Sequence, residues 1–294
     1  MSKSNLTEAY CLTCSRHLKS SAMRKFCHPC FAVLALLAAC TKQEPESPPV
    51  PECAGTSSSA AGRVVVQYRE ELQASTNPAP GLRCRDEVQH PCGNYMLAQT
   101  VTPAYSNGLS INFTGAVAPS LCLTNLDYAY SRVDLGTLVP GNYAVAWQAG
   151  SKQTTGAIRV LADRVEVTSC DSNTVAVRYP VTYRIPATAL WGQAYARTPA
   201  AQAAVAVVLD SLRKEGAVPL MLPAGHYSHF EVGSTGQLIP IPASQNGQPA
   251  TAVTTPVLLS YPGNFARIKG VIKRRPQAAD LSFGLSSAHG EYAW

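Results

Sequence analysis

Short alternating runs of apolar and polar residues occupy the first half of the folded region, from about residue 62 to residue 180. Residues 64–68 form a β-branched run, residues 94–102 alternate, and residues 109–113 alternate directly after Asn107-Gly108, a dipeptide typical of tight hairpin turns. Further short strands are expected at residues 156–161, 165–170 and 174–179. The pattern predicts a β-sandwich of about seven strands over residues 62–180.

The pattern changes after about residue 181, where helical periodicity first appears. Thr198 is a candidate N-cap, Pro199 suits the first helical position, and the apolar residues that follow share one helical face: Val205, Val208, Leu209 and Leu212. A second helix is expected from Asn264 to just before Pro276. Strands are expected at residues 218–222, 226–232, 256–261 and 281–285. Two helices interleaved with strands predict a small α+β domain over residues 181–294.

The first 39 residues carry a separate pattern. Met23, Arg24 and Lys25 form a short positive region, residues 26–37 form an apolar run, and small residues then precede Cys40. This is the layout of a secretory signal peptide. The apolar run is too short to cross a bilayer as a helix.

The cysteines of the same region support a rival interpretation. Two Cys-x-x-Cys pairs, Cys11 with Cys14 and Cys27 with Cys30, have the spacing that places two thiolates on one zinc ion. The second pair runs directly into the apolar run, for which a zinc site has no role, and the gap from Cys14 to Cys27 is short for a four-cysteine site. The signal peptide explains more residues, so we expect no metal site.

Leu37-Ala38-Ala39-Cys40 resembles the lipobox of bacterial lipoproteins. That resemblance implies cleavage before Cys40, a diacylglycerol on its sulfur, and an exported protein held on a membrane by its acyl chains. Thr41, rather than Asp, follows the cysteine, which by analogy with lipoprotein sorting implies the outer membrane, on its periplasmic or surface face. The residues before Met23 imply either a start codon assigned too early or an uncleaved basic leader.

Residues 1–39 are therefore excluded from the expected fold, and residues 40–61, rich in Pro, Ser, Glu and Gly, are expected to be a flexible tether. The excluded segment takes five of the 24 Lys and Arg residues and one of the 18 Asp and Glu residues. The remainder has 19 positive and 17 negative side chains, a net charge of +2. A nearly neutral body gives no indication of nucleic-acid binding.

The segment Leu138-Val139-Pro140-Gly141-Asn142-Tyr143 resembles the Leu-x-Pro-Gly-x-Tyr corner of fibronectin type III and other immunoglobulin-like sandwiches. In that family a tyrosine hydroxyl ties the corner to the backbone upstream. The resemblance implies this role for Tyr143, and it implies that the predicted sandwich is immunoglobulin-like. Tyr143, Val145 and Trp147 share one face of the strand that follows.

Five cysteines follow Cys40, and disulfides are their expected use in an exported protein. Cys84 and Cys92 flank a polar segment, and a disulfide between them would close that segment into a loop. A second disulfide, between Cys122 and Cys170, would then join two strands. An odd count leaves one thiol unpaired, for which Cys53 in the tether is the candidate. The sequence does not fix the pairing. No cysteine lies in a recognisable nucleophile setting.

Residues with catalytic side chains are sparse in the C-terminal part. His226 and His229 are three residues apart in an expected strand and would point to opposite faces, whereas His229 and Glu231 share a face but lack a third metal ligand. Ser286 and His289 lie in a segment that resembles the turn around a hydrolase serine, without the helix that such a turn needs. We therefore expect no catalytic residue and no metal.

Two further groups have both a structural and a functional interpretation. One is a basic cluster, the only one found in the mature chain: Arg267, Lys269, Lys273, Arg274 and Arg275. It is expected to terminate the second helix, and the alternative is contact with anionic lipid head groups or acidic glycans. The other is the three tryptophans, Trp147, Trp191 and Trp294, which are expected in packing and alternatively stack on sugars.

The sequence lacks a phosphate-binding loop, a dinucleotide fingerprint, a kinase signature set and an HExxH motif, so no cofactor is expected. The combined prediction is a multidomain lipoprotein, an immunoglobulin-like sandwich followed by an α+β domain. Its expected function is non-catalytic binding, adhesion or scaffolding at the cell envelope, with an envelope protein or a glycan as ligand and no nucleic acid. The alternative is a hydrolase of envelope or extracellular polymers that uses Ser286, His289 or the His226 region.

Overall fold

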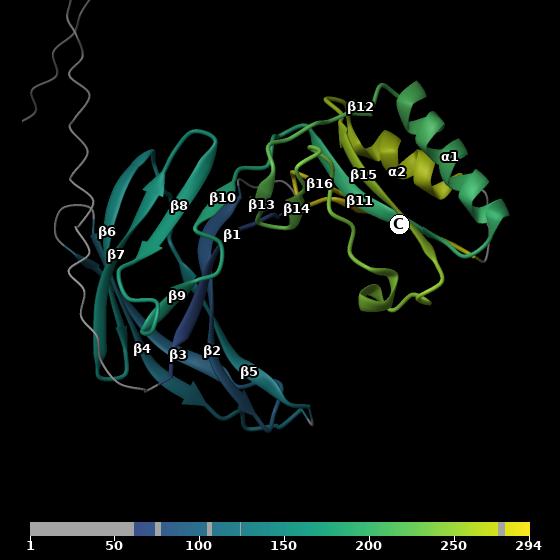
Figure 1. Cartoon of the computed structure of the whole chain (residues 1–294). Coiled ribbons are helices and arrows are strands. Elements are labelled where there is room, and N and C mark those ends of the chain that lie inside the picture. Colours follow the sequence, from purple (N-terminus) through teal and green to yellow (C-terminus); the bar gives the residue numbers. More distant parts are fainter. Residues whose placement is uncertain (1–61, 74–77, 105–107, 124, 276–279) are drawn as a thin grey trace, which may run out of the picture. The chain divides into compact units, whose positions relative to one another are not determined.

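The computed structural model describes residues 62–73, 78–104, 108–123, 125–275 and 280–294, all of which belong to one compact unit. The expected signal peptide, the lipobox with Cys40, and the tether with Cys53 lie outside the described residues. The described chain is mainly β, with two sheets and two α-helices (Figure 1). The β-rich character expected from the alternating pattern is thereby confirmed.

The larger sheet is curled and contains twelve strands in the order β14-β13-β10-β8-β7-β6-β4-β3-β5-β2-β1-β9 (Figure 1). Most neighbours are antiparallel, but four pairs are parallel: β4 with β6, β9 with β1, β3 with β5, and β10 with β13. Its strands are β1 (Val64–Glu71), β2 (Ala79–His90), β3 (Met96–Ala104), β4 (Gly108–Val117), β5 (Asp127–Asp134), β6 (Gly141–Ala149), β7 (Lys152–Val160), β8 (Arg164–Ser169), β9 (Val175–Val177), β10 (Val181–Tyr183), β13 (Gly225–Tyr227) and β14 (Phe230–Val232).

One face of the curled sheet forms the main hydrophobic core. Alternate residues of the strands point to this face, as the pleat requires. Its largest fully buried members are aromatic and aliphatic side chains of β1, β2, β4, β6 and β7: Tyr68, Leu82, Ile111, Phe113, Trp147 and Ile158. The residues between them point outward, and this alternation positions the candidate site described below.

Tyr143, at the start of β6, forms the expected corner. Its hydroxyl donates to the carbonyl oxygen of Val139 at 2.9 Å and accepts from the Val139 amide at 3.2 Å. Gly141 between them has φ 156, close to the extended region. The predicted tie from the tyrosine hydroxyl to the upstream backbone is confirmed.

The smaller sheet has the order β12-β15-β11-β16-β17, with β11 (Ala189–Ala196), β12 (Val218–Pro219), β15 (Val253–Ser260), β16 (Leu281–Ser287) and β17 (Tyr292–Ala293). Helices α1 (Pro199–Lys214) and α2 (Phe265–Lys273) share one core with it. A 3-10 turn, η1, covers Ala243–Asn246. Within the described residues, neither helix has the length and apolar content to cross a membrane.

Both helices begin where the sequence predicts. The Thr198 side chain accepts from the Ala201 amide at 3.2 Å, and the Asn264 side chain accepts from the Ala266 amide at 2.8 Å. The buried residues of α2 are the expected four, Phe265, Ile268, Val271 and Ile272. Local capping and periodicity therefore suffice to place these elements.

Several strands depart from the expected pattern. Residues 79–90 form the twelve-residue strand β2, although the sequence predicts no strand there and a polar segment between Cys84 and Cys92. The sequence pattern also misses β5 and β11. Residues 226–232 were expected as one strand but form the β13–β14 hairpin. Strands β10, β13 and β14 come from the expected second domain and pair within the larger sheet. The boundary near residue 180 stays a prediction.

The disulfide pairing differs from the expected one. Cys92 is bonded to Cys122, at a sequence separation of 30 residues, and Cys84 is a free, fully buried thiol. The expected Cys84–Cys92 and Cys122–Cys170 bridges are therefore wrong. Cys84 lies inside β2, where its side chain packs among the apolar residues of the main core. Cys170 is also disulfide-bonded, and none of these three cysteines is its partner.

Candidate functional site

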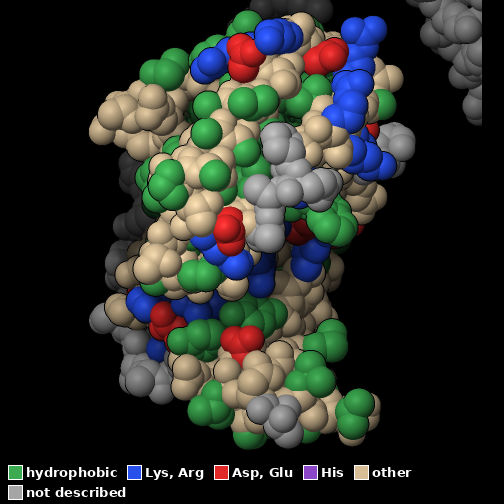
Figure 2. All heavy atoms as spheres, turned by 90° about the vertical axis from the view of Figure 1, so that its right-hand side faces the viewer, with side chains coloured by type: hydrophobic (Ala, Val, Ile, Leu, Met, Phe, Trp, Pro, Cys, Tyr) green, Lys and Arg blue, Asp and Glu red, His purple; other side chains and the backbone are tan. Residues whose placement is uncertain are grey.

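Arginine and tyrosine side chains gather on the outward face of four neighbouring strands, β9, β1, β2 and β5. Even-numbered residues of β1 and β2 and odd-numbered residues of β5 enter the core, so their neighbours in sequence face outward. We call this surface the arginine face, and its members are Gln67, Arg83, Arg85, Tyr128, Tyr130, Arg132, Arg178 and Tyr179. Figure 2 shows Lys and Arg side chains at several places on the side of the molecule that lies to the right in Figure 1, with acidic side chains among them.

The tyrosines hold the guanidinium groups against the sheet. The Arg85 guanidinium carbon lies 4.3 Å from the centre of the Tyr128 ring, and that of Arg83 lies 5.1 Å from the centre of the Tyr130 ring. Arg178 lies 5.3 Å from the Tyr179 ring in the same way. Cation–π contacts of this kind fix the orientation of a guanidinium group without neutralising its charge.

The arginines of this face lack carboxylate partners. Other arginines of the molecule are paired: Arg63 with Glu87 at 2.5 Å, and Arg164 with Glu166 at 2.8 Å. Among the described residues, no ion pair within 4.0 Å involves the four arginines of the face, Arg83, Arg85, Arg132 and Arg178. Their charge is therefore available to a ligand.

The strand register places two of these arginines at paired positions of neighbouring strands. Arg83 of β2 pairs with Arg132 of β5. Gly81 on β2 leaves room for the long side chain of Arg132, since a Cβ at Gly81 would lie 3.1 Å from the Arg132 Nε atom. The two guanidinium groups lean towards opposite ends of the strands, because that of Arg83 lies over Tyr130 and that of Arg132 donates to the Ala79 carbonyl oxygen at 3.4 Å.

A shallow hollow of about 120 Å³ lies in the middle of the face. Its lining is Val65, Gln67, Arg83, Cys84, Arg85, Tyr130 and Arg178. Burial raises the pKa of the Cys84 thiol well above its ordinary value. The thiol is therefore protonated at neutral pH and is a poor nucleophile. The residues that line the hollow can therefore form hydrogen bonds to an anion, but they do not supply a nucleophile for covalent catalysis.

No family model matches the chain, and no curated protein or solved structure matches it. The function of the arginine face has to be argued from its geometry alone.

His226 and Glu231 form the nearest ionisable pair to the face. The β13–β14 turn places His226 opposite Glu231, with its Nδ1 atom 3.8 Å from Glu231 Oε1. The Gln67 amide lies 3.0 Å from His226 Nε2, and the Tyr179 ring stacks on the imidazole at 3.7 Å. The Tyr179 hydroxyl donates to Glu231 Oε1 at 2.6 Å. The expected face-sharing of His229 with Glu231 is therefore wrong, because the chain reverses between them.

His229 has a backbone partner instead. Its Nε2 atom lies 2.7 Å from the Glu70 carbonyl oxygen, and Arg69 donates to its Nδ1 atom at 3.3 Å. Burial is the main cause that lowers the pKa of His229. These contacts dock the β13–β14 hairpin on β1. Among the described residues, no group of three His, Cys, Asp or Glu side chains has the geometry of a metal site.

We expect acid to destabilise the fold through His226. Burial lowers its pKa from 6.5 to about 4, so the folded state favours the neutral ring while the unfolded chain binds the proton near 6.5. The stabilisation is complete above pH 6.5 and is lost as pH falls towards 4. A shift of this size corresponds to about 3 kcal/mol, and solvent screening of the partly exposed ring reduces the expected loss to about 2 kcal/mol. Urea unfolding from pH 4 to 8 measures this loss.

The variant His226→Gln should show a smaller change of stability between pH 6.5 and 4 than the wild type. Its stability at pH 8, where the wild-type ring is neutral, gives the packing cost alone. Parallel curves for the two proteins across this range would contradict the assignment.

Ser286 and His289 are not joined in the described structure. Ser286 lies in β16 opposite Trp191, and within the described part of the chain no hydrogen bond joins its hydroxyl to His289 or to His226. The neighbouring Ser287 hydroxyl accepts from the backbone amides of His289 and Glu291 at 3.3 and 3.2 Å. This segment is organised as a turn between β16 and β17.

Basic side chains at the C-terminal end of α2 form hydrogen bonds to backbone carbonyl groups of the last helical turn. Arg274 Nε donates to the Gly270 carbonyl oxygen at 3.2 Å, and Arg275 donates to the Ile272 carbonyl oxygen at 3.3 Å. Cationic donors at the last carbonyls complement the helix dipole. The sequence prediction that this cluster is the only basic one is wrong, because the arginine face is a second.

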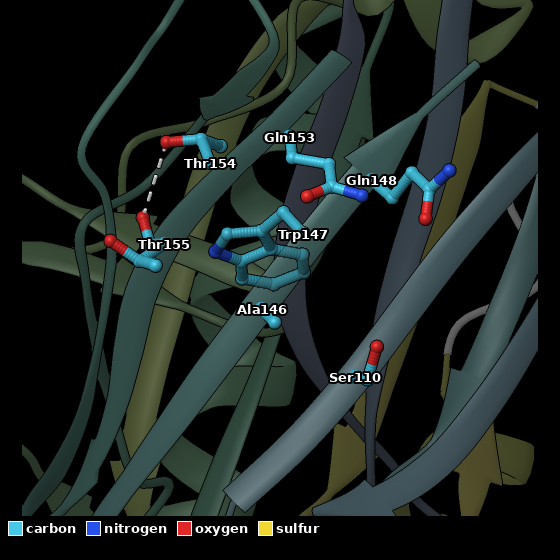
Figure 3. Close-up of a pocket in the computed structure, with 7 residues that line it drawn as sticks. All are labelled: Ser110, Ala146, Trp147, Gln148, Gln153, Thr154 and Thr155. Carbon is cyan, nitrogen blue, oxygen red and sulfur yellow. Dashed lines mark hydrogen bonds between the residues drawn. The ribbon is translucent and has the colours of Figure 1, made fainter. Parts of the chain in front are cut away.

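Two of the three tryptophans are buried and the third is exposed to solvent. Trp147 is 1% exposed, Trp191 is 7% exposed and Trp294 is 76% exposed. A second hollow, of about 430 Å³, lies beside Trp147 and is lined by neutral side chains: Ser110, Ala146, Trp147, Gln148, Gln153, Thr154 and Thr155 (Figure 3). It contains no ionisable group, and the ring of Trp147 lies beneath its surface. This hollow offers neither a proton donor nor an exposed stacking platform.

The arginine face escaped the sequence analysis because its members are far apart in the chain. Arg83 and Arg85 lie in β2, Arg132 in β5, and Arg178 directly after β9. The local signal is an arginine at alternate positions of a strand, in Arg83-Cys84-Arg85. Only the pairing of β9, β1, β2 and β5 unites these residues.

Proposed function

We propose that the protein is exported, is held on an envelope membrane through a lipid on Cys40, and acts as a non-catalytic binding module. The observation that carries the binding role is the arginine face, whose four arginines lack carboxylate partners among the described residues. Guanidinium groups without a counter-charge favour an anionic ligand. The lipid anchor rests on the resemblance of residues 37–40 to a lipobox.

The disulfides support export. The described chain contains the Cys92–Cys122 bridge and a bonded Cys170. Such bonds persist in oxidising compartments and are rare in the cytosol. An exported domain suits this redox environment.

The immunoglobulin-like character of the larger sheet belongs to the same proposal. The adjacent strands β1, β2 and β5 follow the order A-B-E, and β6 with its tyrosine corner corresponds to strand F, with β7 as strand G. The parallel pairing of β4 with β6 departs from the antiparallel sheets of that fold. The resemblance therefore extends to the corner and these strands.

A binding role is favoured over hydrolysis of polymers. A hydrolase that uses Ser286, His289 or His226 requires these side chains to converge with a carboxylate. In the described structure His226 faces Glu231, but the hydroxyl bonded to that carboxylate belongs to Tyr179. Because burial lowers the pKa of His226 to about 4, its imidazole is neutral at pH 7 and its Nε2 atom faces Gln67.

The anchor is tested by the variant Cys40→Ser in the native host. We expect the wild type in the membrane fraction and the variant outside it, because two or three acyl chains hold a protein durably on a bilayer. Cys53→Ser, which changes a cysteine beyond the lipobox, is the matched control and should stay with the membrane. Mass spectrometry of the wild type should find an acylated Cys40 at the N-terminus, and an intact Met1 peptide with a free thiol at Cys40 would contradict the anchor.

A further inference from the structure

A row of polar side chains crosses four strands of the arginine face at one level. Gln67 pairs with Arg83, and Arg83 pairs with Arg132. Arg178 follows Val177, the partner of Val66, and so lies beside Gln67. Neighbouring strands are about 4.8 Å apart, so the row from Arg178 to Arg132 spans about 14 Å. It runs across the strands and is long enough for several units of a linear polymer.

The size of the hollow indicates how a ligand lies on this row. Pockets that enclose small organic ligands have volumes of about 300–1,000 Å³. The hollow between Arg83, Arg85 and Arg178 has about 120 Å³. It holds one small substituent of a ligand, such as a carboxylate, while the rest of the ligand extends over the sheet.

The side chains of the row distinguish between anions. Guanidinium groups fixed on tyrosine rings present paired N–H donors to planar carboxylates. Between them lie neutral hydrogen-bonding groups, the Gln67 amide and the hydroxyls of Tyr128 and Tyr130. A ligand with carboxylates separated by hydroxyl groups satisfies both sets, and uronic acid polymers have this composition. The strand spacing is also close to the length of one sugar ring.

A membrane surface and a nucleic acid fit the face less well. Both are bound mainly by the net charge and by protruding basic side chains. The chain after residue 39 has 19 positive and 17 negative side chains, a net charge of only +2. Three of the four arginines of the face, Arg83, Arg85 and Arg178, contact tyrosine rings, which fixes the orientation of their guanidinium groups. Recognition here depends on short-range hydrogen bonds.

We infer that the arginine face binds a linear acidic polysaccharide, with its carboxylates on Arg83, Arg85, Arg132 and Arg178 across the strands. This inference rests on the proposed binding function and specifies its ligand. One carboxylate occupies the hollow beside Arg83 and Arg85, and a second binds Arg132 at the next strand of the row. The hydroxyls of the sugar rings contact Gln67 and the tyrosines.

The test uses the full chain in a non-ionic detergent at low salt, with polygalacturonate as the probe and its carboxyl-reduced, neutral form as the control polymer. We expect the wild type to bind the first and not the second by calorimetry. The variant Arg83→Gln/Arg85→Gln should weaken binding by about tenfold for each arginine, because each removes a charge-assisted hydrogen bond. Arg83→Lys/Arg85→Lys should restore little affinity, since lysine keeps the charge but lacks the planar pair of donors.

The matched control is Arg213→Gln/Arg267→Gln, which removes the same charge from the helices and should leave the affinity unchanged. Equal urea midpoints show that the variants are folded, and the comparison of the two polymers needs only the wild type. Detergent micelles with phosphatidylglycerol and single-stranded oligothymidylate serve as other polyanions. If either of these binds through Arg83 and Arg85 while polygalacturonate does not, the inferred polysaccharide ligand is wrong. The proposed function as a binding module would still be supported. If no polyanion binds, both proposals are overturned.

Discussion

Replacement of Trp147 by alanine is expected to lower the free energy of unfolding by about 3–5 kcal/mol. The side chain is 1% exposed and belongs to the main core of the larger sheet. Its removal leaves a large cavity, because the strands on either side are fixed by backbone hydrogen bonds to their neighbours. Urea unfolding followed by far-ultraviolet circular dichroism measures the loss at constant pH.

Two further variants separate the causes of this loss. Trp294→Ala removes the same side chain from a position that is 76% exposed, and its stability should stay within about 0.5 kcal/mol of the wild type. Trp147→Phe keeps most of the apolar volume and removes an indole N–H that has no hydrogen-bond partner among the described residues. It should therefore cost much less than Trp147→Ala. A large loss for Trp294→Ala, or none for Trp147→Ala, would contradict the assigned burial.

Local features of the sequence predict those parts of the fold that depend on neighbouring residues. The caps Thr198 and Asn264 and the apolar stripe of α2 are correct because a helix closes its hydrogen bonds within a few residues. The corner at Tyr143 is correct for the same reason, since the hydroxyl bonds to a backbone group four residues away. These features need no knowledge of the rest of the chain.

Strand β2 shows why local patterns fail elsewhere. Its sequence contains Pro80, Gly81 and several charged residues, which are typical of a loop. The strand forms because its inward positions Leu82 and Cys84 complete the core between β1 and β5, and because both neighbours supply hydrogen-bond partners. Tertiary context of this kind overrides weak local preference.

The candidate site depends entirely on long-range pairing. Arg83 and Arg132 are 49 positions apart in the sequence, and Arg178 lies still further along the chain. A run of basic residues such as 273–275 is visible in the sequence, yet in the structure its side chains mainly terminate α2. The chemistry of the arginine face instead comes from strand register, which the sequence alone does not specify.

The disulfide pairing has the same long-range origin, and it carries the second large expected effect. The bond joins Cys92, just after β2, to Cys122 in the segment between β4 and β5. That segment has little core of its own, since Leu121, Leu123 and Leu126 are all more than half exposed. Three hydrogen bonds support it: Gly93 to Leu123, and Asn94 to both Leu121 and Leu123. The covalent bond is thus a main constraint on its position.

The double variant Cys92→Ser/Cys122→Ser is expected to lower the free energy of unfolding by about 3–4 kcal/mol, because the open chain regains the entropy of a loop of about 30 residues. Urea unfolding under non-reducing conditions measures this loss while the bond at Cys170 is kept. Cys84→Ala is the control: it removes a cysteine that forms no bridge, and should cost about 1 kcal/mol. If the double variant unfolds at the midpoint of the wild type, the Cys92–Cys122 bond does not constrain the chain as the structure indicates.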